Sequence, residues 1–173
     1  LVFGGALFDA PVLQSAMCGF VAFCCLASVI YIINDICDAP RDRLHPTKKS
    51  RPIASGAVSP MQAAAEAAVL LAVMLLLSFW CNFPLESYLC LAIYFAVNIG
   101  YSLGLKNVPI LDIALLVSGF LLRVLFGAAV TGIAISDWLY LTVIAMSFYL
   151  GLGKRRGELA RQKGDTRKVL KYY

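Results

Sequence analysis

Charged residues are scarce in this sequence. Of its 173 residues, 14% are Asp, Glu, Lys or Arg and 61% are hydrophobic, and the mean hydropathy is +0.81. Soluble domains carry roughly 25% charged residues, and the apolar runs here reach the length of about 20 residues that a helix needs to cross a bilayer. The composition therefore excludes an ordinary soluble domain and predicts an all-α, polytopic transmembrane helix bundle.

Cysteine pairs of the metal-binding or disulfide kind are also missing. The six cysteines lie within or at the ends of apolar segments, without CxxC spacing, at positions 18, 24, 25, 37, 81 and 90. This pattern indicates small core residues rather than a zinc site or a disulfide framework. The one histidine, His45, leaves two roles open, of which a loop hydrogen bond is favoured over catalysis.

Apolar runs predict five membrane-spanning helices, which account for most of the chain. The expected spanning helices cover approximately residues 12–34, 61–81, 85–104, 111–132 and 136–152. We expect residues 1–173 to form a single transmembrane domain and to be a fragment of a longer chain. The start resembles the last turns of an earlier helix, and it lacks the basic leader of a signal peptide.

Basic residues are missing from one side of this arrangement. Fourteen of the fifteen Lys and Arg residues fall in loops that alternate correctly with the spans, at about 35–60, 104–111 and 153–173. By the positive-inside rule these loops are cytoplasmic, and they are the expected active-site loops of a plasma-membrane protein. The net charge of +5 fits attraction to anionic lipid headgroups and argues against nucleic acid as a partner. The sequence is compatible with an oligomer.

An acidic cluster follows the 12–34 span. On a helix, positions 34, 38 and 42 share one face, with Asp35 beside Asp38. Pro40 tends to kink or end a helix, which weakens the case for Asp42. Carboxylates this close repel one another unless a cation neutralises them, and Mg²⁺ is usually held by one or two carboxylates and substrate phosphates. The cluster predicts Mg²⁺ bound by Asp35 and Asp38, oriented by Asn34 and assisted by Asp42. The alternative is an ordinary solvated helix end.

The loop after the cluster is rich in phosphate-binding donors. It contains the run Lys48-Lys49-Ser50-Arg51, between prolines 46 and 52. Arginine binds phosphate in a bidentate manner and lysine acts as a point charge. Directly after a magnesium site, such a run predicts a cradle for a diphosphate, with Lys48 and Arg51 neutralising the leaving group.

Two motifs carry a resemblance to a known family. Asn-Asp-x-x-Asp-x-x-x-Asp from Asn34, followed by Lys-Lys-x-Arg-Pro-Ile-Ala-Ser-Gly from Lys48, resembles the first signature of the UbiA superfamily of membrane prenyltransferases. The segment from Tyr101 to Lys106 is similar to that superfamily's Tyr-x-x-x-x-Lys diphosphate contact. The resemblance implies a magnesium-dependent transferase in which Tyr101 and Lys106 bind substrate.

The next basic exit departs from most of the superfamily. Where a second aspartate-rich motif is usual, residues 153–158 read Gly-Lys-Arg-Arg-Gly-Glu. This pattern resembles the branch that moves 5-phosphoribose from phosphoribosyl pyrophosphate to a polyprenyl phosphate. It implies that Lys154 and Arg155 hold the 5-phosphate or the lipid phosphate, and that Glu158 contacts ribose or a second metal. The alternatives are a UbiA-type enzyme that prenylates an aromatic or other small acceptor, and a transporter or channel subunit.

A lone basic residue, Arg123, lies inside the 111–132 span. It shares a helical stripe with Asp112 and two glycines, which leave room for a ligand or another helix. Contact with the lipid phosphate or the donor is one interpretation. A structural ion pair with Glu66, the other charge well inside a span, is the second, and the sequence does not separate them.

Overall fold

The computed structural model describes residues 4–105 and 110–161, the last four of these without their side chains. All regular elements in these ranges are helices. They follow in the order α1 (Ala10–Asp42), η1 (Lys48–Ser50), α2 (Pro52–Ser55), α3 (Pro60–Trp80), α4 (Leu85–Leu103), α5 (Leu111–Thr131) and α6 (Asp137–Arg161). The prediction of an all-α chain is therefore confirmed.

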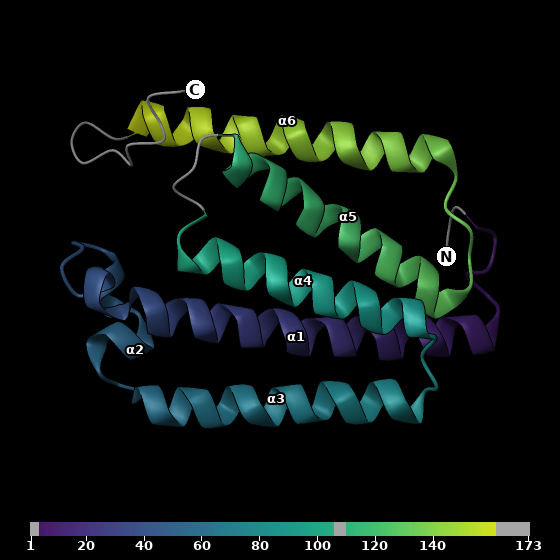
Figure 1. Cartoon of the computed structure of the whole chain (residues 1–173), viewed down its shortest axis with the longest axis horizontal. Coiled ribbons are helices and arrows are strands. Elements are labelled where there is room, and N and C mark those ends of the chain that lie inside the picture. Colours follow the sequence, from purple (N-terminus) through teal and green to yellow (C-terminus); the bar gives the residue numbers. More distant parts are fainter. Residues whose placement is uncertain (1–3, 106–109, 162–173) are drawn as a thin grey trace.

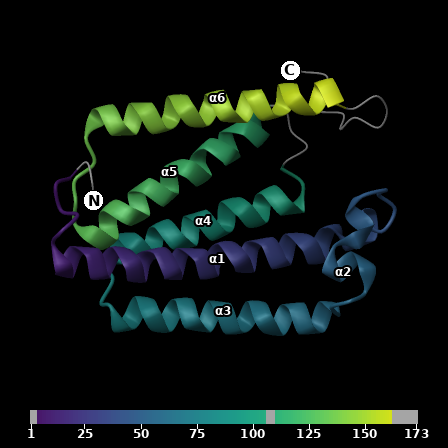
Figure 2. The same ribbon diagram turned by 180° about the vertical axis from the view of Figure 1, so that it is seen from behind.

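The five long helices run back and forth beside one another. Helix α1 packs against α3, α4 and α5, and α5 packs in turn against α4 and α6. Both ribbon views place α3 and α6 at opposite outer sides, with α5 crossing obliquely between α4 and α6 (Figures 1 and 2). The carboxyl ends of α1, α4 and α6 consequently lie at one end of the bundle, together with α2.

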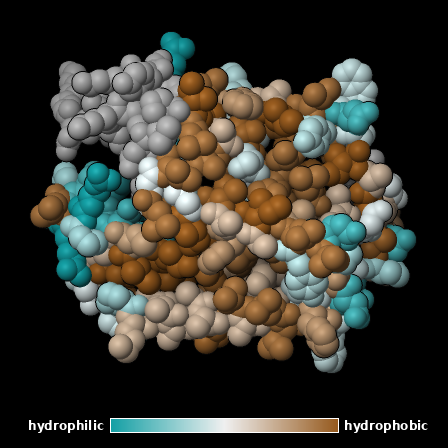
Figure 3. Space-filling model, in the orientation of Figure 1, coloured by the Kyte–Doolittle hydropathy of each residue, from teal (hydrophilic) through white to brown (hydrophobic). Residues whose placement is uncertain are grey.

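Membrane spans are recognisable from length and composition. In the described part of the chain, three helices are long and apolar enough to cross a membrane, namely α1, α3 and α5. The other two long helices, α4 and α6, match predicted spans but are not among the three that length and composition select. A broad apolar band covers the middle of the molecule, and hydrophilic residues gather toward its two ends (Figure 3).

The predicted helix ends agree closely except at two places. Helix α1 continues to Asp42 and α6 to Arg161, beyond the expected ends at 34 and 152. Pro40 lies inside α1 and does not end it, so the expectation that it weakens the position of Asp42 is wrong. A proline N has no proton for the carbonyl four residues earlier. Since the next donors continue the helix, with Arg43 N–H bonded to Ala39 O at 3.1 Å, the loss is confined to one bond near the helix end.

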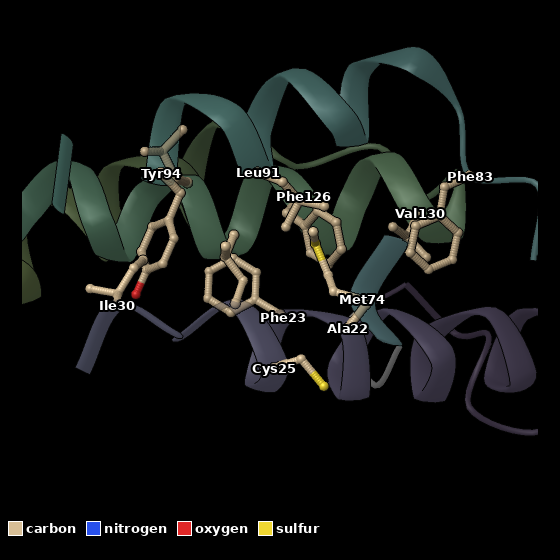
Figure 4. Packing of buried hydrophobic residues seen from close by; sticks show 12 residues of the cluster. Ala22, Phe23, Cys25, Ile30, Met74, Phe83, Leu91, Tyr94, Phe126 and Val130 are labelled. Atoms are coloured by element: carbon tan, nitrogen blue, oxygen red, sulfur yellow. The ribbon is translucent and has the colours of Figure 1, made fainter. Parts of the chain in front are cut away.

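An aromatic cluster holds α1, α4 and α5 together. The Phe23 ring lies 4.6 Å from that of Tyr94 and 5.4 Å from that of Phe126, and these side chains point toward one another from the three helices (Figure 4). Gly19 allows α1 to approach α5, because a Cβ there would lie 3.0 Å from a methyl of Val130. Tilted ring pairs of this kind add to the stability that burial provides.

The loop between α1 and α3 is folded. Ile53 and Ala54 of α2 are buried, and Ile53 forms a small cluster with Ala39 of α1 and Ala63 of α3. Gly56 ends α2 with a φ of 83°, which only glycine adopts readily. Helix α2 therefore rests against the end of α1 that carries the acidic cluster.

Candidate functional site

Two carboxylates of α1 converge on a single guanidinium nitrogen. Nη1 of Arg51 lies 2.9 Å from Oδ1 of Asp35 and 2.8 Å from Oδ2 of Asp42. These aspartates are seven residues apart and so lie on one helical stripe, two turns from each other. Extension of α1 through Pro40 is what brings Asp42 onto this stripe.

Burial differs sharply between the two carboxylates. The Asp42 side chain is 4% exposed, whereas those of Asp35 and Arg51 are 35% and 38% exposed. A buried carboxylate without a partner costs several kcal/mol, so the pair with Arg51 stabilises Asp42 in the folded chain. The Asp35 side of the same guanidinium faces outward and is within reach of a ligand.

Backbone hydrogen bonds hold Arg51 in place, since its N–H donates to the carbonyl of Lys48 and its carbonyl accepts from the N–H of Ser55. Arg51 is the residue that precedes the first turn of α2, and Nε of Arg43 donates to the carbonyl of Ala54 at 3.2 Å. Because α2 is anchored in this way against α1, the Arg51 side chain starts from a fixed point above the carboxylates. Lys48 lies in η1, is partly exposed, and has its N–H bonded to Nδ1 of His45.

His45 has the role of a loop residue. Its Nδ1 accepts the N–H of Thr47 at 3.3 Å and is 3.2 Å from the Thr47 hydroxyl. These contacts confirm the prediction of a loop hydrogen bond. The imidazole joins the start of η1 to the end of α1.

The donor set of the cluster fits a hard divalent ion that also takes ligands from its substrate. Among the described residues, no group of three or more His, Cys, Asp or Glu side chains gathers to hold a metal without help. Two carboxylates with phosphate oxygens and water are, however, the usual surroundings of Mg²⁺. The guanidinium between Asp35 and Asp42 shows that a positive charge fits between them.

A second polar network ties α4, α5 and α6 together at the same end of the bundle. Nε of Arg155 in α6 lies 2.6 Å from Oδ2 of Asp112 in α5, and both side chains are almost fully buried. Nη2 of Arg155 donates to the hydroxyl of Tyr101 in α4 at 3.2 Å. Two predicted substrate contacts, Tyr101 and Arg155, are thus joined to each other.

Arg123 lies farther along the bundle, where its exposed side chain runs beside aromatic rings. Its Nη2 donates to the Tyr94 hydroxyl at 2.9 Å, and its guanidinium carbon is within 5.3 to 5.7 Å of the ring centres of Phe23, Tyr94 and Phe120. Glu66 is exposed on α3 and is not part of this arrangement. The proposed ion pair of Arg123 with Glu66 is wrong, because a tyrosine hydroxyl and three rings satisfy the guanidinium instead.

A cavity of about 640 Å³ lies between α1, α5 and the segment that joins α5 to α6. It is lined mainly by apolar and small residues, including Phe20, Ala27 and Gly127, and Arg123 also lines it. Arg123 is the cavity-lining residue of α5 nearest to the acidic end of the bundle. Eight residues separate Ala27 from Asp35, or about 12 Å along α1, so the cavity lies below the carboxylate site.

Comparison with known proteins places these features in a family. Residues 2–169 match the UbiA prenyltransferase family. The chain belongs to this family. It is 39% identical over 95% of its length to decaprenyl-phosphate phosphoribosyltransferase of Mycolicibacterium smegmatis, and 36% identical over 96% to that of Corynebacterium glutamicum. The chain spans about half the length of these relatives, 52% and 50% respectively.

A solved structure supports the same fold. A UbiA homolog from Archaeoglobus fulgidus, bound to DMAPP and Mg²⁺, superposes with a TM-score of 0.72 at 20% identity, covering 86% of this chain and 54% of that one. The relationship confirms the UbiA-like helix bundle. It concerns the fold alone, since the sequences have diverged widely.

The other residues predicted for the site of this UbiA-family chain differ in their exposure to solvent. Asn34 and Asp38 are partly exposed on the last turns of α1, and Lys154 is exposed one residue before the buried Arg155. Lys106 and the Glu158 side chain lie outside the described residues. The carboxylate site on α1 and the Asp112–Arg155 network lie at one end of the bundle, on different helices.

Two partner residues in these networks were not predicted from the sequence. Asp112 was placed on a stripe with Arg123, and the structure pairs it with Arg155 instead. Tyr94 was not singled out, although its hydroxyl holds Arg123. An available signal was the position of Asp112 in the first turn of α5, at the end of the bundle where the basic exit of α6 also lies.

Proposed function

We propose that the protein containing this chain transfers 5-phosphoribose from phosphoribosyl pyrophosphate to a polyprenyl phosphate and releases diphosphate. The observation that carries this proposal is identity of 36% to 39% over at least 95% of the chain with relatives named decaprenyl-phosphate phosphoribosyltransferase. The matched region includes the carboxylates of α1 and the basic exit of α6. These relatives favour phosphoribosyl transfer over prenyl transfer to a small acceptor.

The donor site in this proposal is the outer end of α1 with its loop. Bound there with the substrate, Mg²⁺ would neutralise the diphosphate and make it a better leaving group. Asp35, Asp38 and Asp42 supply the carboxylate ligands, and Asn34 orients them. Lys48 and Arg51 face the diphosphate from the loop. In the same proposal Tyr101 and Lys106 contact the diphosphate, and Lys154 and Glu158 border the ribose and its 5-phosphate. Arg155 holds the Tyr101 hydroxyl in position.

The reaction requires little proton transfer. The bond between the ribose anomeric carbon and the diphosphate oxygen breaks, and an oxygen of the lipid phosphate forms the new bond to that carbon. Since this nucleophile is already anionic, no strong general base is needed. The residues contribute by positioning both substrates and by stabilising the charge that moves onto the diphosphate.

The cavity below the carboxylate site suits the hydrocarbon of the acceptor. Its lining is apolar and it opens between helices that have the length of membrane spans, so a polyprenyl chain there stays in apolar surroundings. Arg123 then contacts the acceptor lipid. In the same proposal this end of the bundle faces the cytoplasm from the plasma membrane, and the basic residues at the carboxylate end support that orientation through the positive-inside rule.

A donor-selection assay tests the proposal. The full-length protein in detergent receives a polyprenyl phosphate and either phosphoribosyl pyrophosphate or dimethylallyl diphosphate, and released diphosphate is measured with and without Mg²⁺. We expect magnesium-dependent release with phosphoribosyl pyrophosphate, and only when the lipid phosphate is present. Turnover restricted to the prenyl diphosphate with an aromatic acceptor would contradict the proposal, as would solute flux through vesicles without turnover.

A further inference from the structure

Arg51 occupies the place that a bound cation would take. One nitrogen bridges Asp35 and Asp42 at 2.9 and 2.8 Å. A metal ion bound to these carboxylate oxygens would be repelled by the positive charge of the guanidinium. The metal ion and the guanidinium also cannot both bind the same lone pairs of the carboxylates. The two cations therefore compete for one site.

The burial of Asp42 sets the condition under which Arg51 can leave the two carboxylates. Its side chain is 4% exposed, so withdrawal of Arg51 without a replacement would leave a buried negative charge uncompensated. Arg51, in contrast, is 38% exposed, and its guanidinium can turn outward without crossing the protein interior. Its exit is favourable only if a second cation arrives at Asp42 and a new anion receives the guanidinium.

We propose that Arg51 is a tethered counter-ion of Asp35 and Asp42 that exchanges places with the metal–diphosphate complex. Before the donor binds, Arg51 neutralises the two carboxylates. When the complex binds, the metal takes over the carboxylates and Arg51 pairs with the diphosphate oxygens. This inference rests on the proposed function only for the identity of the anion as a diphosphate.

Coupling between the two ligands follows from this exchange. A divalent ion alone must displace Arg51 and offers it no new partner, whereas a diphosphate supplies one through charge-assisted hydrogen bonds. The metal and the diphosphate should therefore each raise the affinity for the other by the same factor. In the absence of diphosphate, Arg51 keeps the site from collecting free divalent ions.

Equilibrium dialysis of the full-length protein with radioactive Mn²⁺ measures this coupling. Mn²⁺ serves as the probe for the metal, and inorganic diphosphate as the probe for the anion. Both Mn²⁺ and its diphosphate complex cross the dialysis membrane, so the excess label on the protein side is the bound metal. The wild type should bind Mn²⁺ at least about tenfold more tightly with diphosphate present, a coupling of ordinary size.

The variant Arg51→Gln should reverse this preference. Mn²⁺ alone should bind roughly three- to tenfold more tightly than to the wild type, because a competing charge at a partly exposed site is gone. The enhancement by diphosphate should fall below about threefold, because the anion has lost its arginine. Arg51→Lys keeps the positive charge but changes its geometry. Its Mn²⁺ affinity and its enhancement by diphosphate should both lie between those of the wild type and Arg51→Gln. Partial unfolding of a variant changes the number of sites and leaves the affinity ratio intact.

Arg41→Gln is the matched control. Arg41 is an exposed cation in the last turn of α1, and in the described structure Asp35 and Asp42 pair with Arg51 rather than with it. This variant should keep the wild-type coupling. If Arg51→Gln binds Mn²⁺ alone no more tightly than the wild type, the counter-ion exchange is wrong while the proposed function stands. If no protein binds Mn²⁺ with or without diphosphate, the metal site itself and the exchange are both wrong. Inorganic diphosphate carries neither a ribose nor a prenyl group. The result of this experiment therefore does not depend on whether the donor substrate has been identified correctly.

Discussion

Asp112 and Arg155 form an ion pair in the interior of the bundle, with Nε of Arg155 2.6 Å from Oδ2 of Asp112. The side chains are 1% and 2% exposed, and Arg155 also donates to Tyr101. The pair therefore fixes the basic end of α6 against α4 and α5. Arg155 acts here on its neighbours, so any influence on a phosphate is exerted through the position of Tyr101 and of the exposed Lys154.

Removal of one member of this pair should destabilise the protein strongly. Asp112→Asn or Arg155→Met alone should lower the free energy of unfolding by about 3–5 kcal/mol, because the remaining charge stays buried without its partner. The double variant Asp112→Leu/Arg155→Met should recover most of this loss, since no unpaired charge remains. Thermal unfolding in detergent, followed by tryptophan fluorescence, provides the measurement. Equal losses in all three variants would show that the pair contributes by shape rather than by charge.

Neutralisation of the carboxylates of α1 should remove activity while the fold persists. Asp35→Asn is nearly isosteric, and it should lower turnover by roughly 10²–10³-fold, comparable to the loss of one strong electrostatic contact in an active site. Diphosphate release at saturating substrate is the measurement. Asp9→Asn, at the opposite end of α1 where Asp9 caps the helix, is the control, because asparagine caps a helix equally well. Unchanged turnover in Asp35→Asn would exclude Asp35 as a ligand of the metal–diphosphate complex.

The sequence predicted most of the fold because lipid imposes simple rules. Long apolar runs locate helices, since backbone groups in a membrane must be satisfied within the helix, and the observed ends of α3, α4 and α5 lie within one or two residues of those expected. The ends of α1 and α6 were placed too early because both helices continue past the apolar run into polar surroundings. Hydropathy registers where the membrane ends rather than where the helix ends.

The candidate site was predicted in composition and less well in geometry. The motif from Asn34 to Asp42 identified the acidic cluster, but the joining of Asp35 to Asp42 through Arg51 depends on how the loop folds back over α1. Likewise, the partners of Arg123 and Arg155 come from other helices. Such contacts are decided by packing between distant segments, and a single sequence carries no direct record of that packing.

Loss of the Arg123 charge should affect the acceptor more than the donor. Phe23, whose ring lies against Arg123, is twelve residues before Asp35, or about 18 Å along α1, which is beyond reach of a diphosphate held at Asp35. We expect Arg123→Gln to raise the KM for polyprenyl phosphate by about five- to tenfold, a loss of about 1.0–1.4 kcal/mol, with the donor KM unchanged. Steady-state kinetics with each substrate varied in turn would show this split.

A comparison of two further variants separates this role from a structural one. Arg123→Lys should restore much of the acceptor affinity, because it keeps a cation near the rings. Tyr94→Phe removes the hydroxyl that accepts from Arg123 and should lower thermal stability with a smaller effect on KM. If Arg123→Gln changes both KM values and the unfolding temperature together, the residue belongs to the core and does not contact the lipid.

Gly127 offers a direct test of the cavity as the place of the acceptor chain. It lines the cavity, and a Cβ built at this position meets no atom within 4 Å, so a larger side chain would extend into the open space without a clash in the described structure. Gly127→Leu should also favour the helix, by up to about 1 kcal/mol. We therefore expect an unfolding temperature at least equal to that of the wild type, together with a KM for long-chain polyprenyl phosphate raised at least about tenfold. A short-chain acceptor should be affected less, because less of it reaches the cavity. Ala64→Leu, which adds the same side chain to the exposed face of α3, should leave both values unchanged. Normal kinetics with the long-chain acceptor in Gly127→Leu would place the lipid elsewhere on the bundle.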